Sequence, residues 1–288
     1  MNDTFVFQTD SIVTKKIYDN NSNYLVDKSA NPQNRSERYC ILYFSSNDIY
    51  YPNTEEAFLS QLVKKDRYEW YKLRINKGSK HIFIRDIKKQ WYLEGINKET
   101  DSIEKVLELL KKETKGYRII TMGSSAGGFA AVLFGSMLDA ETILTFNGQF
   151  FISDLLNTSS ESINPTVFRQ QNNPEINKYY SLRSFIKSPE RVYYFYSDRS
   201  KWDINQHNHV RDLGLNVIPF RTSHHGIPFL KSNLKYVLNL GTEQLNKMVN
   251  HVQHPILFSF KVEGIFGTVS SILQQTKKVL IRKLFNKM

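Results

Sequence analysis

A serine flanked by glycines is the residue of this 288-residue chain with the clearest capacity for chemistry. The segment Gly123-Ser-Ser-Ala-Gly127 fits the pattern G-x-S-x-G only with Ser125 at its centre. In this pattern the serine occupies a strained turn between a strand and a helix, where a side chain at either glycine would collide with nearby backbone. The N–H of Ala126, at the helix N-terminus, points to where a tetrahedral oxyanion would form. The motif therefore predicts a nucleophilic serine.

A nucleophilic serine needs a general base, and two adjacent histidines follow the last predicted strand. They lie in the segment Thr222-Ser-His-His-Gly226. We expect His225 to be the base, with His224 as the alternate, because a loop histidine here could reach the serine from the carboxyl edge of a sheet. Adjacent histidines could also bind a metal, but the chain has one cysteine and no H-E-x-x-H motif. We expect no metal site.

An acidic residue should orient the histidine. In strand–turn–helix folds of this kind the acid follows the serine and precedes the histidine in the chain. Asp198 comes two residues after the apolar run that ends at Tyr196, which places it at the end of a predicted strand. We expect Asp198 to accept the imidazole Nδ1–H, with Asp203 as the fallback. The alternative for Asp198 is a turn aspartate that bonds to its own backbone.

Two further loops could contribute to the site. The loop Phe44-Ser-Ser-Asn-Asp48 follows an early strand and places Ser45 and Ser46 near the oxyanion, and the backbone N–H of Ser45 is the expected second donor. Asp86, Trp91 and Tyr92 follow another predicted strand and could line a groove for the acyl acceptor, in which aromatic faces stack on sugars. Packing of these aromatic rings in the core is the alternative.

Strands alternate with helices around these residues. Strands are expected at 39–44, 81–85, 117–122, 142–146, 191–196 and 215–220, and helices near 55–65, 102–113 and after Gly128. This order predicts an α/β fold with a mostly parallel central sheet and helices on both faces.

The chain divides into three parts by composition. Residues 1–38 are polar, with short β-like patches at 4–7 and 23–26, and we expect peripheral strands and loops there. Residues 39–250 form the expected catalytic domain, in which the proline-containing segment 151–188 is a lid or an insertion. Residues 255–288 form a basic amphipathic tail, expected to be helical.

The formal net charge of +11 could favour nucleic acid, anionic lipid or an acidic polymer. Nucleic-acid binding is not expected, because no basic and aromatic motif of the usual modules occurs. Residues 261–288 carry six Lys and Arg residues against one Glu, with apolar residues at helical spacing. This pattern favours an interfacial helix on an anionic membrane surface, although packing against its own domain or a partner fits equally.

The N-terminus lacks a basic segment followed by an apolar one, so a secretion signal is not expected. The lone Cys40 lies in an apolar run and excludes an internal disulfide. We expect a cytoplasmic protein, peripheral on the inner face of the cell membrane.

Together the Ser125 turn, the Phe44-Ser45 loop, Asp198 and His225 resemble the α/β-hydrolase superfamily over roughly residues 39–240. The form Gly-Ser-Ser-Xaa-Gly-Gly and the Phe-Ser loop are similar to bacterial capsular-polysaccharide O-acetyltransferases of this fold. That resemblance implies O-acetyl transfer to a surface polysaccharide, or its removal, with acetyl-CoA as the acyl donor and no bound cofactor. A carboxylesterase acting on small esters and a non-catalytic module that binds glycan or a partner are the alternatives.

Overall fold

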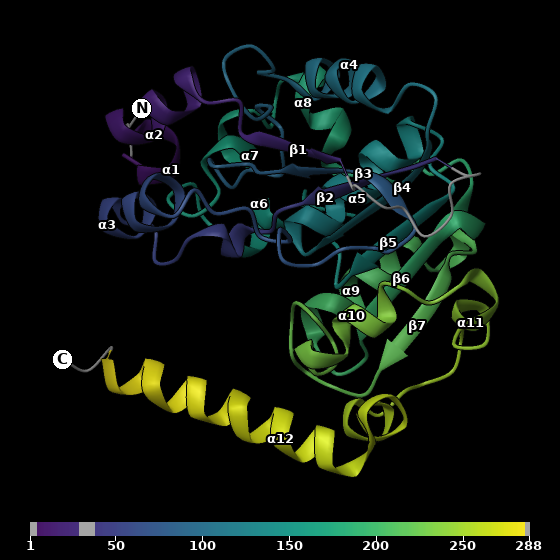
Figure 1. Cartoon of the computed structure of the whole chain (residues 1–288). Helices are drawn as coiled ribbons and strands as arrows, with labels where there is room; N and C mark the ends of the chain where they lie inside the picture. The colour runs from purple at the N-terminus through teal and green to yellow at the C-terminus, as the bar shows by residue number, and fades with distance from the viewer. Residues whose placement is uncertain (1–4, 29–37, 286–288) are drawn as a thin grey trace.

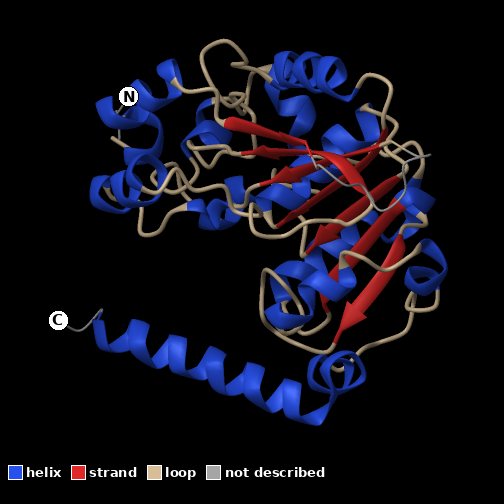
Figure 2. Cartoon of the chain, viewed as in Figure 1, coloured by secondary structure: helices blue, strands red, loops and turns tan. Residues whose placement is uncertain are grey.

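A seven-stranded sheet runs through the middle of the protein (Figures 1 and 2). The computed structural model describes residues 5–28 and 38–285. The strand order is β1-β3-β2-β4-β5-β6-β7, with β1 antiparallel to β3 and the other neighbouring pairs parallel. This confirms the predicted mostly parallel sheet. The strands are β1 (Tyr24–Lys28), β2 (Tyr39–Phe44), β3 (Gly78–Ile84), β4 (Arg118–Ser124), β5 (Thr142–Phe146), β6 (Val192–Ser197) and β7 (Asn216–Phe220).

Helices cover both faces of the sheet, as the sequence predicts (Figure 2). Alternate strand residues point to opposite faces. Leu42 joins a core with α4 (Ile103–Thr114) and α5 (Ala126–Met137), whereas the next residue, Tyr43, joins a second core with elements after β7. The remaining helices of these layers are α9 (Lys201–Val210), α10 (Leu234–Val237) and α11 (Thr242–Asn246). Because β2 is buried along its whole length, it lies between the two layers.

The helix α4 shows how local sequence sets these boundaries. Ser102 caps its N-terminus by accepting a hydrogen bond from the Lys105 N–H. Ile103, Val106 and Leu110 lie at helical spacing and are buried against the sheet. Near the predicted helix at 55–65, the structure has α3 (Glu55–Phe58) followed by a π-helix (Leu59–Lys64). Short 3₁₀ helices are at Asn47–Ile49, Lys178–Tyr180, Pro189–Arg191, Arg211–Leu213 and Lys231–Asn233.

The N-terminal segment differs from the expected strands and loops. Its described part has two helices, α1 (Phe7–Asp10) and α2 (Ile12–Asn20), before the edge strand β1. Ser11 explains the difference, because its Oγ accepts from the Thr14 N–H and caps α2. The apolar residues of 4–7 are followed by this cap rather than by a turn between strands.

The segment 151–188 is an insertion between β5 and β6, and it does not cover the site as a lid. It forms α6 (Leu155–Thr158), α7 (Pro165–Arg169) and α8 (Pro174–Asn177). Its apolar residues join the core formed with α4 and α5. In the part of the chain that the structure describes, none of its residues lines the pocket around Ser125.

The C-terminal helix α12 (Pro255–Phe285) leaves the body of the protein (Figure 1). A kink at Gly264, with φ 70° and ψ 177°, divides it into two arms. Phe258 on the first arm packs against Phe220 and Phe229 next to the sheet. On the second arm, Phe266 is 93% exposed. The stretch Pro255–Gln274 is long and apolar enough to cross a membrane by length and composition.

Candidate active site

Ser125 sits in the strained turn that its motif predicts. It lies between the end of β4 and the start of α5, with φ 52° and ψ −121°, which few residues other than glycine adopt. Its N–H is bonded to the Phe146 carbonyl at 3.1 Å, at the end of the neighbouring strand β5. The backbone thus holds the nucleophile at the carboxyl edge of the sheet, where active sites of open α/β folds lie.

The glycines of the motif are required by close backbone contacts. A Cβ atom on Gly123 would lie 2.1 Å from the Gly127 carbonyl oxygen. A Cβ atom on Gly127 would lie 2.4 Å from the carbonyl oxygen of Phe44, and one on Gly128 would lie 2.6 Å from the Cα of Gly148. Since real Cβ atoms do not approach backbone so closely, the turn keeps this shape only with glycine at these positions.

Ser125, His225 and Asp203 form a continuous hydrogen-bonded relay. His225 Nε2 is 2.9 Å from Ser125 Oγ, and His225 Nδ1 is 2.8 Å from Asp203 Oδ1. An ionised carboxylate only accepts hydrogen bonds, so Nδ1 carries the proton and Nε2 is free to accept from the serine hydroxyl. The Asp203 side chain is fully buried and that of His225 is 39% exposed. The arrangement can therefore remove the serine proton at a surface that a substrate reaches.

The acid in this relay is Asp203, and the expectation of Asp198 is corrected. The Asp198 N–H bonds to the Phe220 carbonyl at 2.9 Å and so extends the pairing of β6 with β7. Its Oδ1 is buried without a hydrogen-bond partner among the described residues. Asp203 comes five residues later, in the first turn of α9, where Ser200 caps the helix by accepting from the Asp203 N–H. The rule that acids follow strand ends missed it, although the Ser-x-x-Asp capping pattern marks this first turn.

A buried network beneath His225, which the sequence analysis did not identify, fixes the histidine loop. Asn147 follows β5 with φ 43°, and its Nδ2 donates to Ser197 Oγ at 2.9 Å and to the His224 carbonyl at 3.2 Å. Ser197, the last residue of β6, also donates from Oγ to the same carbonyl at 2.6 Å and from its N–H to Asn147 Oδ1 at 2.8 Å. The ends of β5 and β6 and the loop after β7 are thus joined beneath His225. The position of Asn147 directly after a predicted strand is the sequence feature that could have indicated this network.

The oxyanion site combines the start of α5 with the loop after β2. Ala126 is the first residue of α5, so its N–H has no acceptor within the helix. The Ser45 N–H, expected as the second donor, instead bonds to the Ile84 carbonyl at 3.0 Å in the sheet. A Cβ on Gly127 would lie 2.9 Å from the Ser45 carbonyl carbon, so the Ser45–Ser46 peptide packs on the first turn of α5. The Ser46 N–H donates to Glu69 Oε2 at 2.5 Å, and Ser46 lines the same pocket as Ser125.

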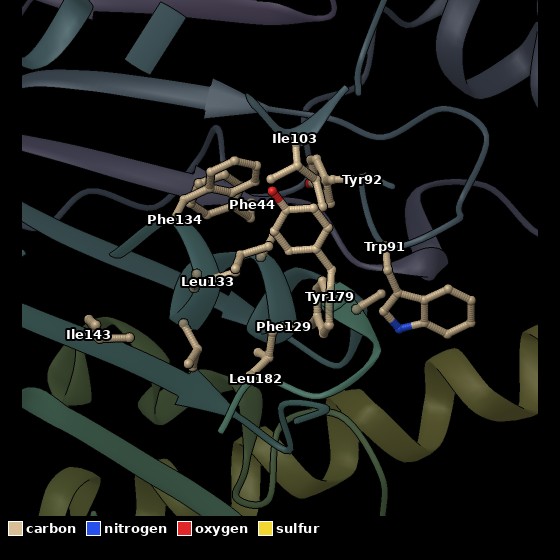
Figure 3. Packing of buried hydrophobic residues seen from close by; sticks show 14 of the residues in the cluster. Phe44, Trp91, Tyr92, Ile103, Phe129, Leu133, Phe134, Ile143, Tyr179 and Leu182 are labelled. Atoms are coloured by element: carbon tan, nitrogen blue, oxygen red, sulfur yellow. The ribbon is translucent and has the colours of Figure 1, made fainter. Parts of the chain in front are cut away.

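The predicted acceptor groove is part of the protein core. Trp91 and Tyr92 are 3% and 1% exposed and lie among the residues of the core that contains Phe44 and Phe134 (Figure 3). Asp86 is buried and accepts hydrogen bonds from the backbone N–H groups of residues 88, 89, 90 and 92, which turns the loop inward. Burial raises the pKa of Asp86 to about 6.

Tyr92 and Trp91 bond to loops of the site from its buried side. Tyr92 donates from its hydroxyl to the Ser45 carbonyl at 3.0 Å, and Trp91 donates from Nε1 to Gln149 Oε1. The alternative of aromatic core packing is therefore the one that the structure shows.

A pocket of about 480 Å³ opens next to Ser125 and His225. Its wall has two cationic side chains, Arg67 and Lys231, and two acidic ones, Asp48 and Glu69. The remaining lining residues are Ser46, Asn47, Trp70, Leu73, Ser124, His224, Gly226, Ile227 and Leu234. The pocket is thus partly apolar with a few charged groups, as in many sites for small acyl substrates.

His224, the alternate base, also lines this pocket without joining the relay. Partial burial lowers the pKa of His224, and the nearby charge of Lys231 lowers it further. Among the described residues, no group of three or more His, Cys, Asp or Glu side chains is arranged to hold a metal ion.

Comparisons with known proteins place the fold but not the sequence family. No protein-family model matches the chain. No curated protein matches it either. Among solved structures, the capsule O-acetyltransferase of Neisseria meningitidis serogroup A in complex with caged gadolinium matches with a TM-score of 0.50 and 16% identity. The match covers 75% of this chain and 90% of that chain. The chain has an α/β-hydrolase fold.

Two further solved structures of this fold are more distant. A mutant of the same capsule O-acetyltransferase in complex with CoA is 14% identical over 70% of this chain and 83% of that one, with a TM-score of 0.43. S-formylglutathione hydrolase from Staphylococcus aureus is 10% identical over 79% of this chain and 98% of that one, with a TM-score of 0.42. The α/β-hydrolase fold predicted from the Ser125 motif is confirmed.

Proposed function

We propose that this protein is a serine-dependent acyltransferase that moves an acetyl group to a hydroxyl of a bacterial surface polysaccharide. The observation that carries the proposal is the relay of Ser125, His225 and Asp203, with distances of 2.9 and 2.8 Å. Such a relay makes a serine hydroxyl nucleophilic toward the carbonyl carbon of an ester, a thioester or an amide.

Acylation begins when Ser125 Oγ attacks the carbonyl carbon of the donor while His225 Nε2 takes the hydroxyl proton. The carbonyl oxygen becomes an oxyanion, stabilised by the Ala126 N–H and the N-terminal end of α5. When the tetrahedral intermediate collapses, the bond to the leaving thiolate or alkoxide breaks and His225 returns the proton to that group. Asp203 stabilises the imidazolium while it holds this proton.

Deacylation repeats these steps with a second nucleophile. His225 removes the proton from an acceptor hydroxyl, whose oxygen attacks the acetyl-serine, and the proton then returns to Ser125 Oγ. If water takes the place of the sugar hydroxyl, the same residues catalyse ester hydrolysis. The difference between a transferase and an esterase thus lies in whether the pocket orients an acceptor and excludes water.

Acetyl-CoA is the proposed donor and a surface polysaccharide the proposed acceptor. The similar solved structure is a capsule O-acetyltransferase, and a mutant form of that enzyme was solved with CoA. The pocket of this chain adds support, because Arg67 and Lys231 offer positive charge to phosphate groups near the serine. A carboxylesterase acting on small esters is the second candidate. The open pocket beside His225 favours it because water can reach the acyl-serine there.

The test compares donors and acceptors in one assay. Purified full-length protein is incubated with acetyl-CoA or p-nitrophenyl acetate, with and without a soluble polysaccharide fragment. We expect CoA release that increases with the polysaccharide and yields an O-acetylated product. Rapid hydrolysis of p-nitrophenyl acetate with no stimulation by any polysaccharide would favour the esterase.

We also propose that the protein works in the cytoplasm, attached to the inner face of the cell membrane through α12. Of the stretch Pro255–Gln274, 17% is buried, so apart from residues such as Phe258 most of this segment does not pack on its own domain. Ile265, Phe266 and Leu273 expose large apolar side chains on the second arm. The following residues, 275–288, add five Lys and Arg residues and no acidic one. Apolar side chains followed by positive charge suit an anionic bilayer surface.

The features of α12 fit a helix that lies on the membrane surface better than one that crosses the membrane. Lys261 and Glu263 interrupt the apolar stretch, and Gly264 breaks the helix between its arms. Thr268 is buried and donates from Oγ1 to Ser259 Oγ at 3.2 Å and to the Gly264 carbonyl at 2.8 Å, which holds the two arms at the kink. A helix bent and held in this way presents its second arm along a surface.

Liposome flotation tests the attachment. We expect full-length protein to float with vesicles of phosphatidylglycerol and phosphatidylcholine, and much less with phosphatidylcholine alone or in high salt. The double variant Phe266→Ser/Leu273→Ser should lose flotation, whereas Ile12→Ser, which removes an equally exposed apolar side chain on α2, should keep it. If the wild type does not float but self-associates, and the two substitutions abolish this self-association, the second arm would instead bind a second copy of the chain.

A further inference from the structure

A carboxylate holds the backbone N–H of Ser46 in the wall of the pocket that contains Ser125. The Ser46 N–H donates to Glu69 Oε2 at 2.5 Å, and the Ser46 hydroxyl donates to Glu69 Oε1 at 3.0 Å. Glu69 and Ser46 both line the pocket that contains Ser125 and His225. An ionised carboxylate at this place competes with any oxyanion for the same N–H and repels its negative charge.

The segment that carries Glu69 is fixed against the loop after β2, so the contact is not that of a free surface side chain. Trp70 donates from Nε1 to the Phe44 carbonyl at 2.7 Å. Arg67 donates from Nη1 to the carbonyls of Asp48 and Ile49 at 3.1 and 2.9 Å. The backbone on both sides of Glu69 is thereby tied to residues 44–49, which places its carboxyl group on Ser46.

We propose that the Ser46 N–H is the second donor of the oxyanion site and that Glu69 is a gate on it: the Glu69 carboxylate closes the site by holding this N–H, and the site opens when that group is neutral or displaced. This inference rests on the proposed acyl transfer by Ser125. Glu69 does not touch the reacting atoms in this role, and it acts by making one hydrogen-bond donor available or unavailable.

The charged groups around Glu69 determine the pH at which the gate opens. Burial raises the pKa of Glu69, and Asp48 raises it further, whereas the bonds from Ser46 and the charge of Arg67 lower it. Lys231, His224 and His225 are the other titratable or charged groups that line the same pocket.

Because the pKa of Glu69 is raised, its neutral form persists to a higher pH than for an ordinary glutamate. The open form is therefore lost as pH rises through this pKa. Removal of the Glu69 charge should have little effect at acidic pH and a growing effect toward alkaline pH.

The experiment measures how fast diisopropyl fluorophosphate labels Ser125 in the full-length protein between pH 5 and 9, by intact mass. The phosphoryl oxygen of this reagent occupies the oxyanion site when the serine attacks phosphorus. We expect Glu69→Gln to raise the labelling rate at alkaline pH by roughly tenfold, a part of the roughly 10²- to 10³-fold that one oxyanion donor contributes. The ratio of the two rates should fall toward one at acidic pH. Glu55→Gln, which removes an exposed carboxylate on α3 outside this pocket, should leave the labelling rate close to that of the wild type.

The outcomes separate the gate from the proposed function. Labelling of Ser125 with the same rate and pH profile in the wild type and Glu69→Gln would overturn the gate and leave the nucleophile in place. Slower labelling of Glu69→Gln at every pH would also overturn it, since Glu69 would then support the site. No labelling of Ser125 in either protein would overturn the acyl transfer and the gate together. A crystal structure of the labelled protein should show the Ser46 N–H on the phosphoryl oxygen, with Glu69 moved away.

Discussion

At the scale of single residues, the choice of acid decides how the site works. Asp203 is fully buried and accepts from His225 Nδ1, whereas no hydrogen bond joins the Asp198 carboxylate to the histidine. Burial strengthens the interaction of Asp203 with the imidazolium that forms during catalysis. Two aspartates five residues apart therefore have different functions, and substitution distinguishes them.

We expect Asp203→Asn to lower kcat by roughly 10⁴-fold, because an amide can stabilise the wrong tautomer of the imidazole and cannot balance its charge. Asp198→Asn is the matched control and should leave kcat close to that of the wild type. The measurement is the steady-state rate with p-nitrophenyl acetate, with thermal unfolding as the check on folding. Equal losses in the two variants would contradict the assignment of Asp203.

Site residues that belong to a local sequence pattern could be predicted from the sequence. Site residues that depend on contacts in the folded chain could not. Ser125 and Ala126 belong to one turn whose glycines fix its shape. The expectation of Asp198 is wrong because its position after a strand does not tell which carboxylate reaches His225, and the Ser45 N–H is not free because the sheet already uses it. The Ser45 N–H is bonded to Ile84, which no pattern in the sequence indicates.

At the scale of elements, the site is built from strand ends that are bonded to one another. Asn147 after β5 and Ser197 at the end of β6 both hold the His224 carbonyl, and this fixes the loop that carries His225. The base is therefore positioned by neighbouring strands rather than by its own loop. Weakening this network should affect catalysis more than stability.

Ser197→Ala removes two hydrogen bonds of the network and should lower kcat/KM by roughly ten- to a hundredfold, because the histidine loop is no longer held in place. Its cost in unfolding free energy should be about 1–2 kcal/mol. Ser11→Ala is the control, since loss of the α2 cap costs about 1 kcal/mol without contact to the site. If both variants lose stability and neither loses activity, the network does not position the base.

The sheet strands were predictable because buried apolar runs alternate with helical patterns, and β5 at Thr142–Phe146 has the expected boundaries. The N-terminal helices were missed because the cap at Ser11 was not recognised. For the loop at residues 86–92, the sequence leaves an acceptor groove and aromatic core packing as alternatives. The positive φ angles of this loop at Lys89, Trp91 and Tyr92 turn the aromatic rings into the core, which only the folded chain reveals.

At the scale of the whole molecule, the catalytic domain and the second arm of α12 are separate in space (Figure 1). The first arm packs through Phe258 on the core beneath the sheet, while Phe266 and Leu273 on the second arm are exposed. Catalysis and membrane attachment should therefore be separable by substitution.

We expect Phe266→Ser/Leu273→Ser to transfer acetyl groups to a soluble polysaccharide fragment at the wild-type rate. With an acceptor anchored in anionic vesicles, the same variant should be slower than the wild type, because the enzyme is no longer concentrated at the surface. Initial rates with both forms of the acceptor measure the difference. An equal loss of activity with the soluble fragment would show that the second arm belongs to the catalytic site.

The central claim is that Ser125 forms the acyl-enzyme, and intact mass spectrometry after a brief incubation with acetyl-CoA or p-nitrophenyl acetate tests it most directly. The account predicts one added acetyl group on the wild type, located on Ser125 by peptide mapping, and none on Ser125→Ala. An acetyl adduct that persists in Ser125→Ala, or turnover that does not depend on this residue, would contradict it.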